Sequence, residues 1–263
     1  MEEKPYESYS QSERHSWITE YILEQGSLLV DDLVERFSVS RMTIHRDLDD
    51  LEEQGVLRKI RNGATAQPSN YFESEVRFRL NRQTKEKEAI CRAALSFIEP
   101  GQAIFLDEAT TLLPLVHLLP TVVPLTVITN FLPILNELRS HKEIHLIALG
   151  GRYLSRFDTF TGLLCEQSVQ ALHADSFFTS TSAVSNCIAY HPDQQVVRVK
   201  RAMMANTSQH YMLLDHTKFG KAALYQFAEL SEFERVIIDS GVNENQLARM
   251  QENNIQVEIA TIE

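Results

Sequence analysis

Hydrophobic and polar positions follow a helical rhythm in the first quarter of the chain. Trp17, Tyr21 and Ile22 fall on one stripe, which predicts a first helix. This helix is expected to begin near Glu13 and to stop at Gly26, because glycine commonly ends a helix.

A second helix follows after a short extended stretch. Asp31 and Asp32 bring negative charge to its start, as the helix dipole favours. Leu33 and Phe37 lie four positions apart and form its buried face. A tight connector then ends at Ser40, which we expect to cap the next helix.

The third helix is predicted over residues 41–54 and separates apolar from charged positions. Ile44, Leu48 and Leu51 recur at i, i+4 and i+7, so they point inward. The opposite face is basic in its first half, and its carboxylates are confined to the second half. Gly55 is expected to end the helix.

A basic hairpin comes next, with the turn Asn62-Gly63 as a strong hairpin signal. Helix, helix, tight turn, helix and hairpin is the order of a winged helix-turn-helix, whose recognition helix enters the major groove of DNA. An amphipathic helix hairpin used for protein contacts would show a similar pattern. The residues predicted to contact double-stranded operator DNA are Arg41, Thr43, His45, Arg46, Arg58, Lys59 and Arg61.

Beyond this hairpin the pattern predicts a linker and a second domain. We expect a disordered start at residues 1–12, a winged helix-turn-helix at 13–66, a linker with a connecting helix at 67–88, and the second domain at 89–263. The connecting helix, expected over residues 72–88, is either solvated or part of a contact between subunits.

The second domain alternates unbroken apolar runs with helical stretches. Strands are expected at residues 103–106, 125–129, 144–149, 176–178, 211–214, 236–238 and 255–259. Helices are expected between them, including residues 132–139, 195–206 and 244–253. Continuous apolar strands that alternate with helices indicate a doubly wound, mostly parallel α/β sheet covered on both faces. In such sheets ligands bind at the carboxyl ends of the strands.

Composition is that of a globular protein, with 43% hydrophobic and 23% charged residues. No apolar run reaches the length of a membrane helix, and the polar start does not read as a signal peptide, so we expect a cytoplasmic protein. The formal charge is −11, and residues 1–66 contain 8 Lys and Arg against 14 Asp and Glu. DNA binding must therefore come from the local placement of charge.

The three cysteines, Cys91, Cys165 and Cys187, lie far apart and form no C-x-x-C pair. A sparse, odd number of cysteines argues against a disulfide framework and against a zinc module. We expect buried structural thiols, with no metal and no cofactor.

The recognition segment Thr43-Ile-His-Arg-Asp-Leu48 resembles the DeoR-family signature, in which the recognition helix contains Thr-Ile-Arg-Arg-Asp-Leu. The resemblance extends over most of the chain. Its landmarks in the second domain are Leu106-Asp107, Thr110-Thr111, Thr129-Asn130, Gly150-Gly151, Thr161-Gly162, Lys200-Arg-Ala-Met-Met and Leu214-Asp215-His-Thr-Lys218. Within the family, Arg61-Asn-Gly-Ala and Thr129-Asn-Phe-Leu-Pro are similar to the ascorbate-utilisation repressor branch.

The resemblance implies an effector domain with the fold of ribose-phosphate and glucosamine-phosphate isomerases, which senses a phosphorylated sugar or sugar acid. Hydroxyl and backbone N–H groups at the start of a helix suit a phosphate, lysines supply positive charge, and aspartates accept sugar hydroxyls. The residues expected to bind the effector are Asp107, Thr110, Thr111, Thr129, Asn130, Gly150, Gly151, Lys200, Asp215 and Lys218. Singly, each has a simpler role: an aspartate can cap a turn, and a lysine on a helix can be solvated.

The chain departs from the family pattern at His45, at Glu108-Ala109 and at Thr179-Ser-Thr-Ser-Ala-Val, which stands where the family usually has a Gly-rich segment. His45 stands where the family usually has arginine, which would alter base preference. Glu108 and Ala109 replace the family's small Ser or Ala and Gly after the strand aspartate. A carboxylate beside a phosphate is repulsive unless it points away.

We therefore expect a repressor of a carbohydrate-utilisation operon that a phosphorylated sugar releases from DNA, as a homo-oligomer, either a dimer or a tetramer. The alternative is an active sugar-phosphate isomerase with a DNA-binding appendage. Isomerisation needs a positioned general base, for which Asp107, Glu108 and Asp215 are candidates, but no His–Glu pair is expected beside them. No catalytic residue is therefore assigned. A protein-interaction scaffold would leave the polar strand ends unexplained.

Overall fold

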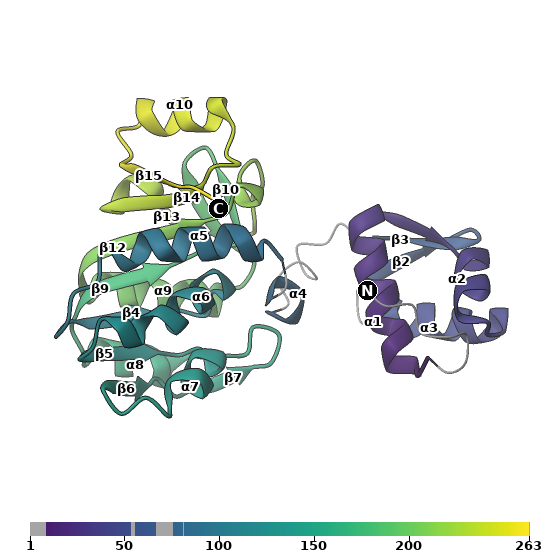
Figure 1. Ribbon diagram of the computed structural model, residues 1–263, viewed down its shortest axis with the longest axis horizontal. Coiled ribbons are helices and arrows are strands. Elements are labelled where there is room, and N and C mark those ends of the chain that lie inside the picture. The colour runs from purple at the N-terminus through teal and green to yellow at the C-terminus, as the bar shows by residue number, and fades with distance from the viewer. Residues whose placement is uncertain (1–8, 54–55, 67–75, 81, 263) are drawn as a thin grey trace. The chain divides into compact units, whose positions relative to one another are not determined.

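The computed structural model describes residues 9–53, 56–66, 76–80 and 82–262. The chain divides into two compact units, Met1–Glu73 and Ser74–Glu263 (Figure 1). The division falls within the linker predicted at residues 67–88. Part of that linker, and residues 1–8 of the predicted disordered start, lie outside the described residues.

The first unit is a winged helix-turn-helix, as predicted. It contains α1 (Gln11–Gln25), β1 (Ser27–Leu29), α2 (Val30–Phe37), α3 (Arg41–Glu53), β2 (Leu57–Ile60) and β3 (Gly63–Ala66). The strands form an antiparallel sheet in the order β1-β3-β2. α1 begins at a capping box between Ser10 and Glu13 and ends at Gly26, whose φ of 77° only glycine adopts readily.

The core of this unit comes from the apolar stripes of its helices. Ile44, Leu48 and Leu51 of α3 are buried together with Ile18 and Ile22 of α1. The predicted cap of α3 is also present, since the Thr43 amide donates to Ser40 Oγ at 3.1 Å. The inward stripe fixes the rotation of α3 and leaves its opposite face to solvent.

The second unit is built on a seven-stranded parallel sheet, as predicted. Its strands are β4 (Ala103–Leu106), β5 (Leu125–Thr129), β6 (Ile144–Ala148), β9 (Ala174–Thr179), β12 (Thr207–Leu214), β14 (Arg235–Asp239) and β15 (Val257–Ala260). They lie in the order β15-β14-β12-β9-β4-β5-β6. The chain winds outward in one direction from β4 and in the other from β9. These two neighbours therefore meet at a topological switch point, where doubly wound sheets form a crevice for ligands.

Helices cover both faces of this sheet (Figure 1). One hydrophobic cluster joins it to α5 (Thr84–Leu95), α6 (Leu113–Leu118) and α7 (Leu132–Leu138). A second cluster joins the other face to α8 (Leu163–Gln170), α9 (Gln194–Ala205) and α10 (Glu244–Glu252). Successive residues alternate between the clusters, with Ile104 in the first and Phe105 in the second, as the pleat of a strand requires.

Two small antiparallel sheets at the edge of this fold were not predicted from the sequence. β7 (Arg152–Leu154) pairs with β8 (Thr159–Thr161). β11 (Ile188–His191) lies between β10 (Ala183–Ser185) and β13 (Tyr225–Glu229). Both sheets lie in segments that follow strands of the main sheet, so they shape its carboxyl edge.

The prediction of a single connecting helix over residues 72–88 is wrong for those of its residues that the structure describes. Two helices are present, α4 (Val76–Leu80) and α5, and residues 72–75 lie outside the described part. α5 buries Ala89, Ile90 and Ala94 against the sheet, so it belongs to the core of the second unit and is not a solvated linker. The apolar stripe was not recognised in the sequence, because charged residues of the outer face alternate with it.

The cysteines were expected to be buried, and this is confirmed for Cys91 and Cys165, while Cys187 is half-buried. All three are free thiols. In the described part of the chain, no helix is long and apolar enough to cross a membrane. Among the same residues, His, Cys, Asp and Glu nowhere gather in threes in a way that would hold a metal ion.

Candidate functional site

The outward face of α3 presents the predicted DNA-binding side chains to solvent. Arg41, His45 and Arg46 are exposed, and Thr43 is half-buried. Met42, which the sequence reasoning did not select, is 66% exposed on the same face. An apolar side chain in this position is suited to contact a thymine methyl group.

The two arginines of α3 differ in their ion pairs. Arg41 forms an exposed ion pair with Asp31 of α2. Arg46 has no carboxylate within ion-pair distance among the described residues, and its Nη2 atom lies 4.0 Å from the sulfur of Met42. Arg46 is therefore the α3 cation most available to an external anion.

The hairpin between β2 and β3 places the three predicted wing cations differently. Arg58 and Arg61 are exposed. Lys59 is half-buried, its ammonium pairs with Asp49 of α3, and its backbone N–H donates to Glu52 at 2.7 Å. Lys59 therefore fastens the wing to α3, and Arg58 and Arg61 remain as the exposed wing cations.

One residue that orients α3 was missed in the sequence. Asp47 is buried and accepts two hydrogen bonds from Arg14 of α1, at 2.7 and 3.0 Å. His15 Nε2 lies 3.2 Å from the same carboxylate. The position was detectable, because Asp47 falls three residues after Ile44 on the inward stripe, where a lone carboxylate needs a buried partner. This pair holds α3 against α1.

In the second unit, a buried ionic cluster lies where β4 and β9 end. Lys200 of α9 places its ammonium 2.5 Å from Asp107, 3.0 Å from Glu108 and 3.0 Å from the Ser180 carbonyl oxygen. The Thr179 hydroxyl donates a hydrogen bond to the Asp107 carboxylate. Lys200, Asp107 and Glu108 are at most 1% exposed. Glu108, expected to repel a phosphate, is thus neutralised by a lysine.

Burial and charge act in opposite directions on this cluster. Burial raises the pKa of Asp107 to about 6, although the nearby Lys200 ammonium opposes the rise. Burial lowers the pKa of Lys200, but its two carboxylate partners outweigh that effect and leave the pKa raised. At neutral pH Lys200 is therefore charged.

A narrow cavity opens beside this cluster. Its lining consists of Arg79, Glu108, Ala109, Thr111, Ser180, Thr181, Ser182, His191 and Lys218. These residues come from α4, from the ends of β4, β9 and β11, and from two 3₁₀ turns, η1 (Thr110–Leu112) and η3 (His216–Lys218). The cavity leaves no room for a water molecule, so an entering ligand must displace at least one lining side chain.

Several polar atoms that line the cavity are buried and make no hydrogen bond. They are Nε and Nη2 of Arg79, Oγ of Ser180 and Ser182, Oε2 of Glu108 and Nε2 of His191. Buried polar groups are nearly always satisfied, and a cluster of unsatisfied groups indicates a missing partner. Guanidinium and hydroxyl donors together suit an anionic, oxygen-rich ligand.

The structure corrects the expectation that no histidine accompanies Glu108. His191 Nε2 lies 3.7 Å from Glu108 Oε1, and both side chains are buried. Burial lowers the pKa of His191 well below its usual value, and the positive charges of Lys200 and Arg79 add to the effect. His191 comes from β11, a strand that the sequence did not predict, so its approach to Glu108 was not foreseen.

The structure brings the predicted effector residues together only in part. Thr111 and Lys218 line the cavity, and Asp107 and Lys200 lie beside it in the ionic cluster. Thr110 is buried, and its hydroxyl accepts from Lys87 Nζ at 3.3 Å. Asp215 is also buried and caps η3 by accepting from the Thr217 amide at 3.1 Å.

The remaining four predicted residues do not line this cavity and support the turns after β5 and β6. Thr129 Oγ1 accepts from the Phe131 amide at 3.1 Å, and Asn130 donates to the Phe160 carbonyl oxygen at 2.9 Å. Gly151 has a φ of 139°, and a Cβ there would lie 2.5 Å from the Thr161 carbonyl oxygen. Gly151 thus permits close packing of backbone, whereas Gly150 has open space around it.

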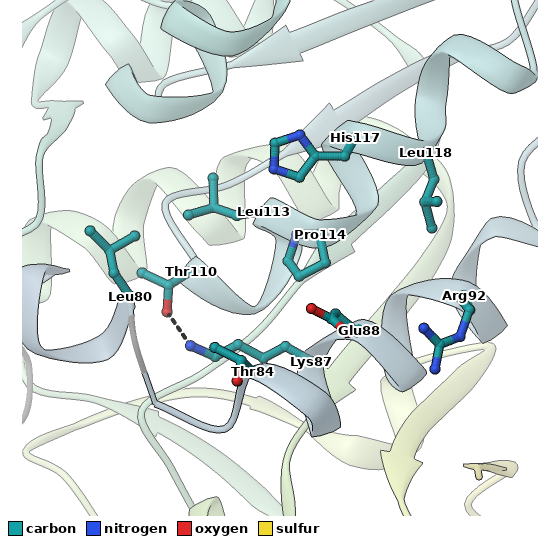
Figure 2. Close-up of a pocket in the computed structure, with 10 residues that line it drawn as sticks. All are labelled: Leu80, Thr84, Lys87, Glu88, Arg92, Thr110, Leu113, Pro114, His117 and Leu118. Atoms are coloured by element: carbon teal, nitrogen blue, oxygen red, sulfur yellow. Dashed lines mark hydrogen bonds between the residues drawn. The ribbon is translucent and has the colours of Figure 1, made fainter. Parts of the chain in front are cut away.

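A wider pocket of about 380 Å³ lies beside Lys87 and Thr110 (Figure 2). Its lining comes from α4, α5, η1 (Thr110–Leu112) and α6. Leu80, Leu113, Pro114 and Leu118 give it an apolar surface, and the pocket was not predicted from the sequence. Lys87 and Thr110 line this pocket and do not line the narrow cavity.

Comparison with known families accounts for both units. Residues 14–70 match the model of the DeoR-like helix-turn-helix domain, and residues 82–240 match the DeoR C terminal sensor domain. A solved structure of ribose 5-phosphate isomerase A from Methanocaldococcus jannaschii is 13% identical with a TM-score of 0.37, over 51% of this chain and 53% of that one.

Curated relatives match over nearly the whole chain. The glycerol-3-phosphate regulon repressor of Escherichia coli is 31% identical over 95% of this chain and 99% of its own length. The lactose phosphotransferase system repressor of Staphylococcus epidermidis is 32% identical over 85% of this chain and 90% of its own. The chain thus belongs to the DeoR family of DNA-binding transcription regulators, with a helix-turn-helix unit followed by a sensor domain.

Proposed function

We propose that this regulator represses a carbohydrate-utilisation operon and leaves its operator when a phosphorylated sugar or sugar acid binds the sensor domain. The carrying observation is the narrow cavity at the switch point of the sheet, with unsatisfied buried donors on Arg79, Ser180 and Ser182. Relatives named as repressors of a glycerol-3-phosphate regulon and of a lactose phosphotransferase system support the same ligand class.

On the DNA side, we infer that Arg46 reads a base, with Thr43, His45 and Met42 beside it on α3. An exposed arginine on a recognition helix can donate two hydrogen bonds to guanine. Arg58 and Arg61 bind phosphates of the backbone, and Arg41 joins them once DNA competes with Asp31. Lys59 has mainly a structural role, because it already pairs with Asp49.

On the ligand side, we assign the phosphate to Arg79, Lys218 and the hydroxyl of Thr111. Ser180 and Ser182 hydrogen-bond to sugar hydroxyls. Lys200 pairs with Asp107 and Glu108 and holds both side chains in place, so it shapes the cavity more than it binds the ligand.

The alternative activity, sugar-phosphate isomerisation, needs a carboxylate or imidazole free to move a proton. Asp107 and Glu108 are both paired with Lys200, and Asp215 caps a turn. The pair of Glu108 and His191 is the arrangement that favours catalysis, and it is buried beside the lysine. We therefore propose that the sensor domain binds without turnover. Conversion of a bound sugar phosphate to its isomer, followed by NMR, would overturn this.

The test starts from an operator isolated by selection from random DNA, followed by fluorescence anisotropy of the labelled site. Sugar phosphates and the matching unphosphorylated sugars are first screened by thermal shift, since a ligand raises stability by mass action. We expect at least one sugar phosphate to raise the melting temperature and to release the DNA. If no phosphorylated compound does either, the assignment of the effector class is wrong.

We also propose that the regulator acts in the cytoplasm as a homo-oligomer of at least two chains. Helix-turn-helix proteins commonly pair two recognition helices on two half-sites one helical turn apart. Light scattering on the free protein and on the operator complex tests this, and a monomer bound to a single half-site would contradict it.

A further inference from the structure

Glu108 and His191 bring two buried, unsatisfied polar atoms to the lining of the narrow cavity. Each residue is 1% exposed. Within the described part of the chain, Glu108 Oε2 and His191 Nε2 make no hydrogen bond. Nε2 lies 3.7 Å from Glu108 Oε1, which is beyond hydrogen-bond distance. Buried polar atoms are nearly always satisfied, so both atoms call for a partner that enters the cavity.

Glu108 offers an acceptor whose position is fixed. Its Oε1 atom lies 3.0 Å from the ammonium of Lys200, and the same ammonium pairs with Asp107. The ion pair at Oε1 holds the carboxylate in one orientation and leaves the lone pairs of Oε2 unused.

His191 offers a donor whose position is also fixed. The Asp193 amide donates to Nδ1 at 3.1 Å, so Nδ1 is an acceptor and the neutral ring has its proton on Nε2. Burial lowers the pKa of His191 well below its usual value, so the ring is neutral at physiological pH. The ring packs against Phe157, with the ring centroids 5.1 Å apart.

We propose that Glu108 and His191 together recognise one hydroxyl group of the effector, which donates to Glu108 Oε2 and accepts from the Nε2–H of His191. A hydroxyl group satisfies both atoms because it is a donor and an acceptor at once. A ketone oxygen only accepts and an ammonium only donates, so each would leave one buried atom unpaired. The inference rests on the proposed function and adds to it the ligand class, a phosphorylated compound with an alcohol at this position.

The same pair determines how the ligand lies in the cavity. Ligand entry requires a lining side chain to move, because the cavity has no room for a water molecule. Ser182 and Lys218 are half-buried and can move outward, whereas Glu108 and His191 are held by their neighbours. An anion is disfavoured beside Glu108. The phosphate therefore lies toward Lys218, and the hydroxyl group lies at the buried end.

The test uses phosphorylated probes that differ from one another in a single group. Glycerol 3-phosphate is compared with dihydroxyacetone phosphate, which has a ketone in place of the central hydroxyl, and with 3-hydroxypropyl phosphate, which lacks it. Ribose 5-phosphate is compared with its 2-deoxy and 3-deoxy analogues, and inorganic phosphate is included. Calorimetry on the full chain measures each affinity. Any other sugar phosphate found by the thermal-shift screen is treated in the same way.

For the hydroxylated probe that binds the parent, one particular hydroxyl group should be required. Its replacement by hydrogen or by a ketone should weaken binding by about 10- to 100-fold, because one or both buried atoms are then left unpaired. This series uses no substitution in the protein, so it tests the hydroxyl requirement even if a variant does not fold.

Substitutions then assign the requirement to the two residues. Glu108→Gln can replace the acceptor by an amide donor, so the preference for the alcohol over the ketone should fall to within about threefold. His191→Asn keeps an acceptor for the Asp193 amide but has no Nε2–H. It should weaken binding of the hydroxylated probe by about tenfold and leave binding of the deoxy analogue unchanged. His191→Gln can supply a donor again and should lie between Asn and the parent.

Glu99→Gln and His141→Asn are the matched controls, because both residues are exposed in the same unit and neither lines the cavity. Both controls should keep the preference of the parent. Urea unfolding of every variant shows whether a loss of affinity comes from a loss of stability.

Equal affinity of the parent for the hydroxylated, deoxy and keto forms of every probe that binds would overturn the inference and leave the proposed function in place. The parent's preference in Glu108→Gln and His191→Asn would also overturn it. An equal loss of affinity for all probes, together with lower unfolding stability, would show a merely structural role and would overturn it as well. If no phosphorylated compound binds the parent, the proposed function fails first, and the inference fails with it.

Discussion

The DNA-binding face and the sensor cavity both depend on cations, but they hold them in opposite ways. On α3 and the wing, Arg46, Arg58 and Arg61 are exposed to solvent. In the sensor domain, Lys200 is fully buried between two carboxylates. Exposed charges contribute little to stability and adapt to a partner, whereas buried charges stabilise only in fixed geometry. The first region is arranged for binding a long polyanion, and the second for recognising one small ligand.

The same comparison explains how a net acidic unit can bind DNA. Each of three carboxylates is engaged by a cation: Asp31 by Arg41, Asp47 by Arg14 and Asp49 by Lys59. These pairs reduce repulsion of phosphate, but they also occupy cations. We therefore expect weak binding to random DNA at physiological salt, and specificity that depends on a few side chains.

Lys200→Met should have the largest effect on stability. It leaves Asp107 and Glu108 buried without a counter-ion, which should reduce the free energy of unfolding of the sensor domain by about 3 to 5 kcal/mol. Urea unfolding followed by far-UV circular dichroism measures this, and Lys142→Met, at an exposed position, is the control. Equal stability of the two variants would mean that the buried cluster does not support the fold.

Asp47→Asn should destabilise the first unit by about 2 to 3 kcal/mol, because Arg14 then loses its charged partner. Trp17 is the only tryptophan in the chain and lies in α1, so its fluorescence reports unfolding of this unit. We expect the fluorescence transition to shift while the transition of the sensor domain stays in place. A shift of the unfolding transition of the sensor domain alone would contradict the claim that Asp47 stabilises the first unit.

Arg46→Ala should weaken specific operator binding by about 1 to 3 kcal/mol and relax the choice of base at one position. Because the side chain is exposed, unfolding stability should change by no more than about 0.5 kcal/mol. Binding to a library of single-base operator variants measures both effects. An unchanged preference at every base would show that Arg46 contacts only the backbone or none of the DNA.

His191→Gln should change how stability depends on pH. The pKa of His191 is lowered in the folded protein, so below pH 6.5 the unfolded chain binds a proton that the folded chain does not. The parent should therefore lose about 1 kcal/mol more than the variant between pH 6.5 and pH 5.5. Parallel stability curves would mean that His191 is solvated or charged in the folded protein.

Much of the fold could be predicted from the sequence, because the spacing of hydrophobic residues shows which face of a helix or strand is buried. The stripe of Ile44, Leu48 and Leu51 correctly placed the inner face of α3, and the continuous apolar runs correctly indicated a parallel sheet. The DNA-binding residues follow from the same periodicity, since a buried stripe defines the exposed face opposite to it.

The cavity was less predictable, because its residues come from segments whose placement depends on tertiary contacts. Arg79 belongs to a helix of five residues and His191 to a strand of four residues, and neither has a strong local pattern. Lys200 was identified, but its carboxylate partners are 93 and 92 residues away, so its buried pairing could not be read from spacing. In the first unit, the buried pairing of Asp47 was also missed, although its place on the apolar stripe of α3 indicates a buried partner.

The central claim is that an anion in the narrow sensor cavity controls DNA binding, and Lys218→Ala tests it most directly. Lys218 lines that cavity and lies outside the DNA-binding unit. In anisotropy titrations of the operator complex with the sugar phosphate that releases the parent, the variant should bind DNA within about twofold of the parent. It should require at least about tenfold more ligand for release, because a charged partner of the anion is lost. Release of the variant at the same ligand concentration as the parent would contradict the account.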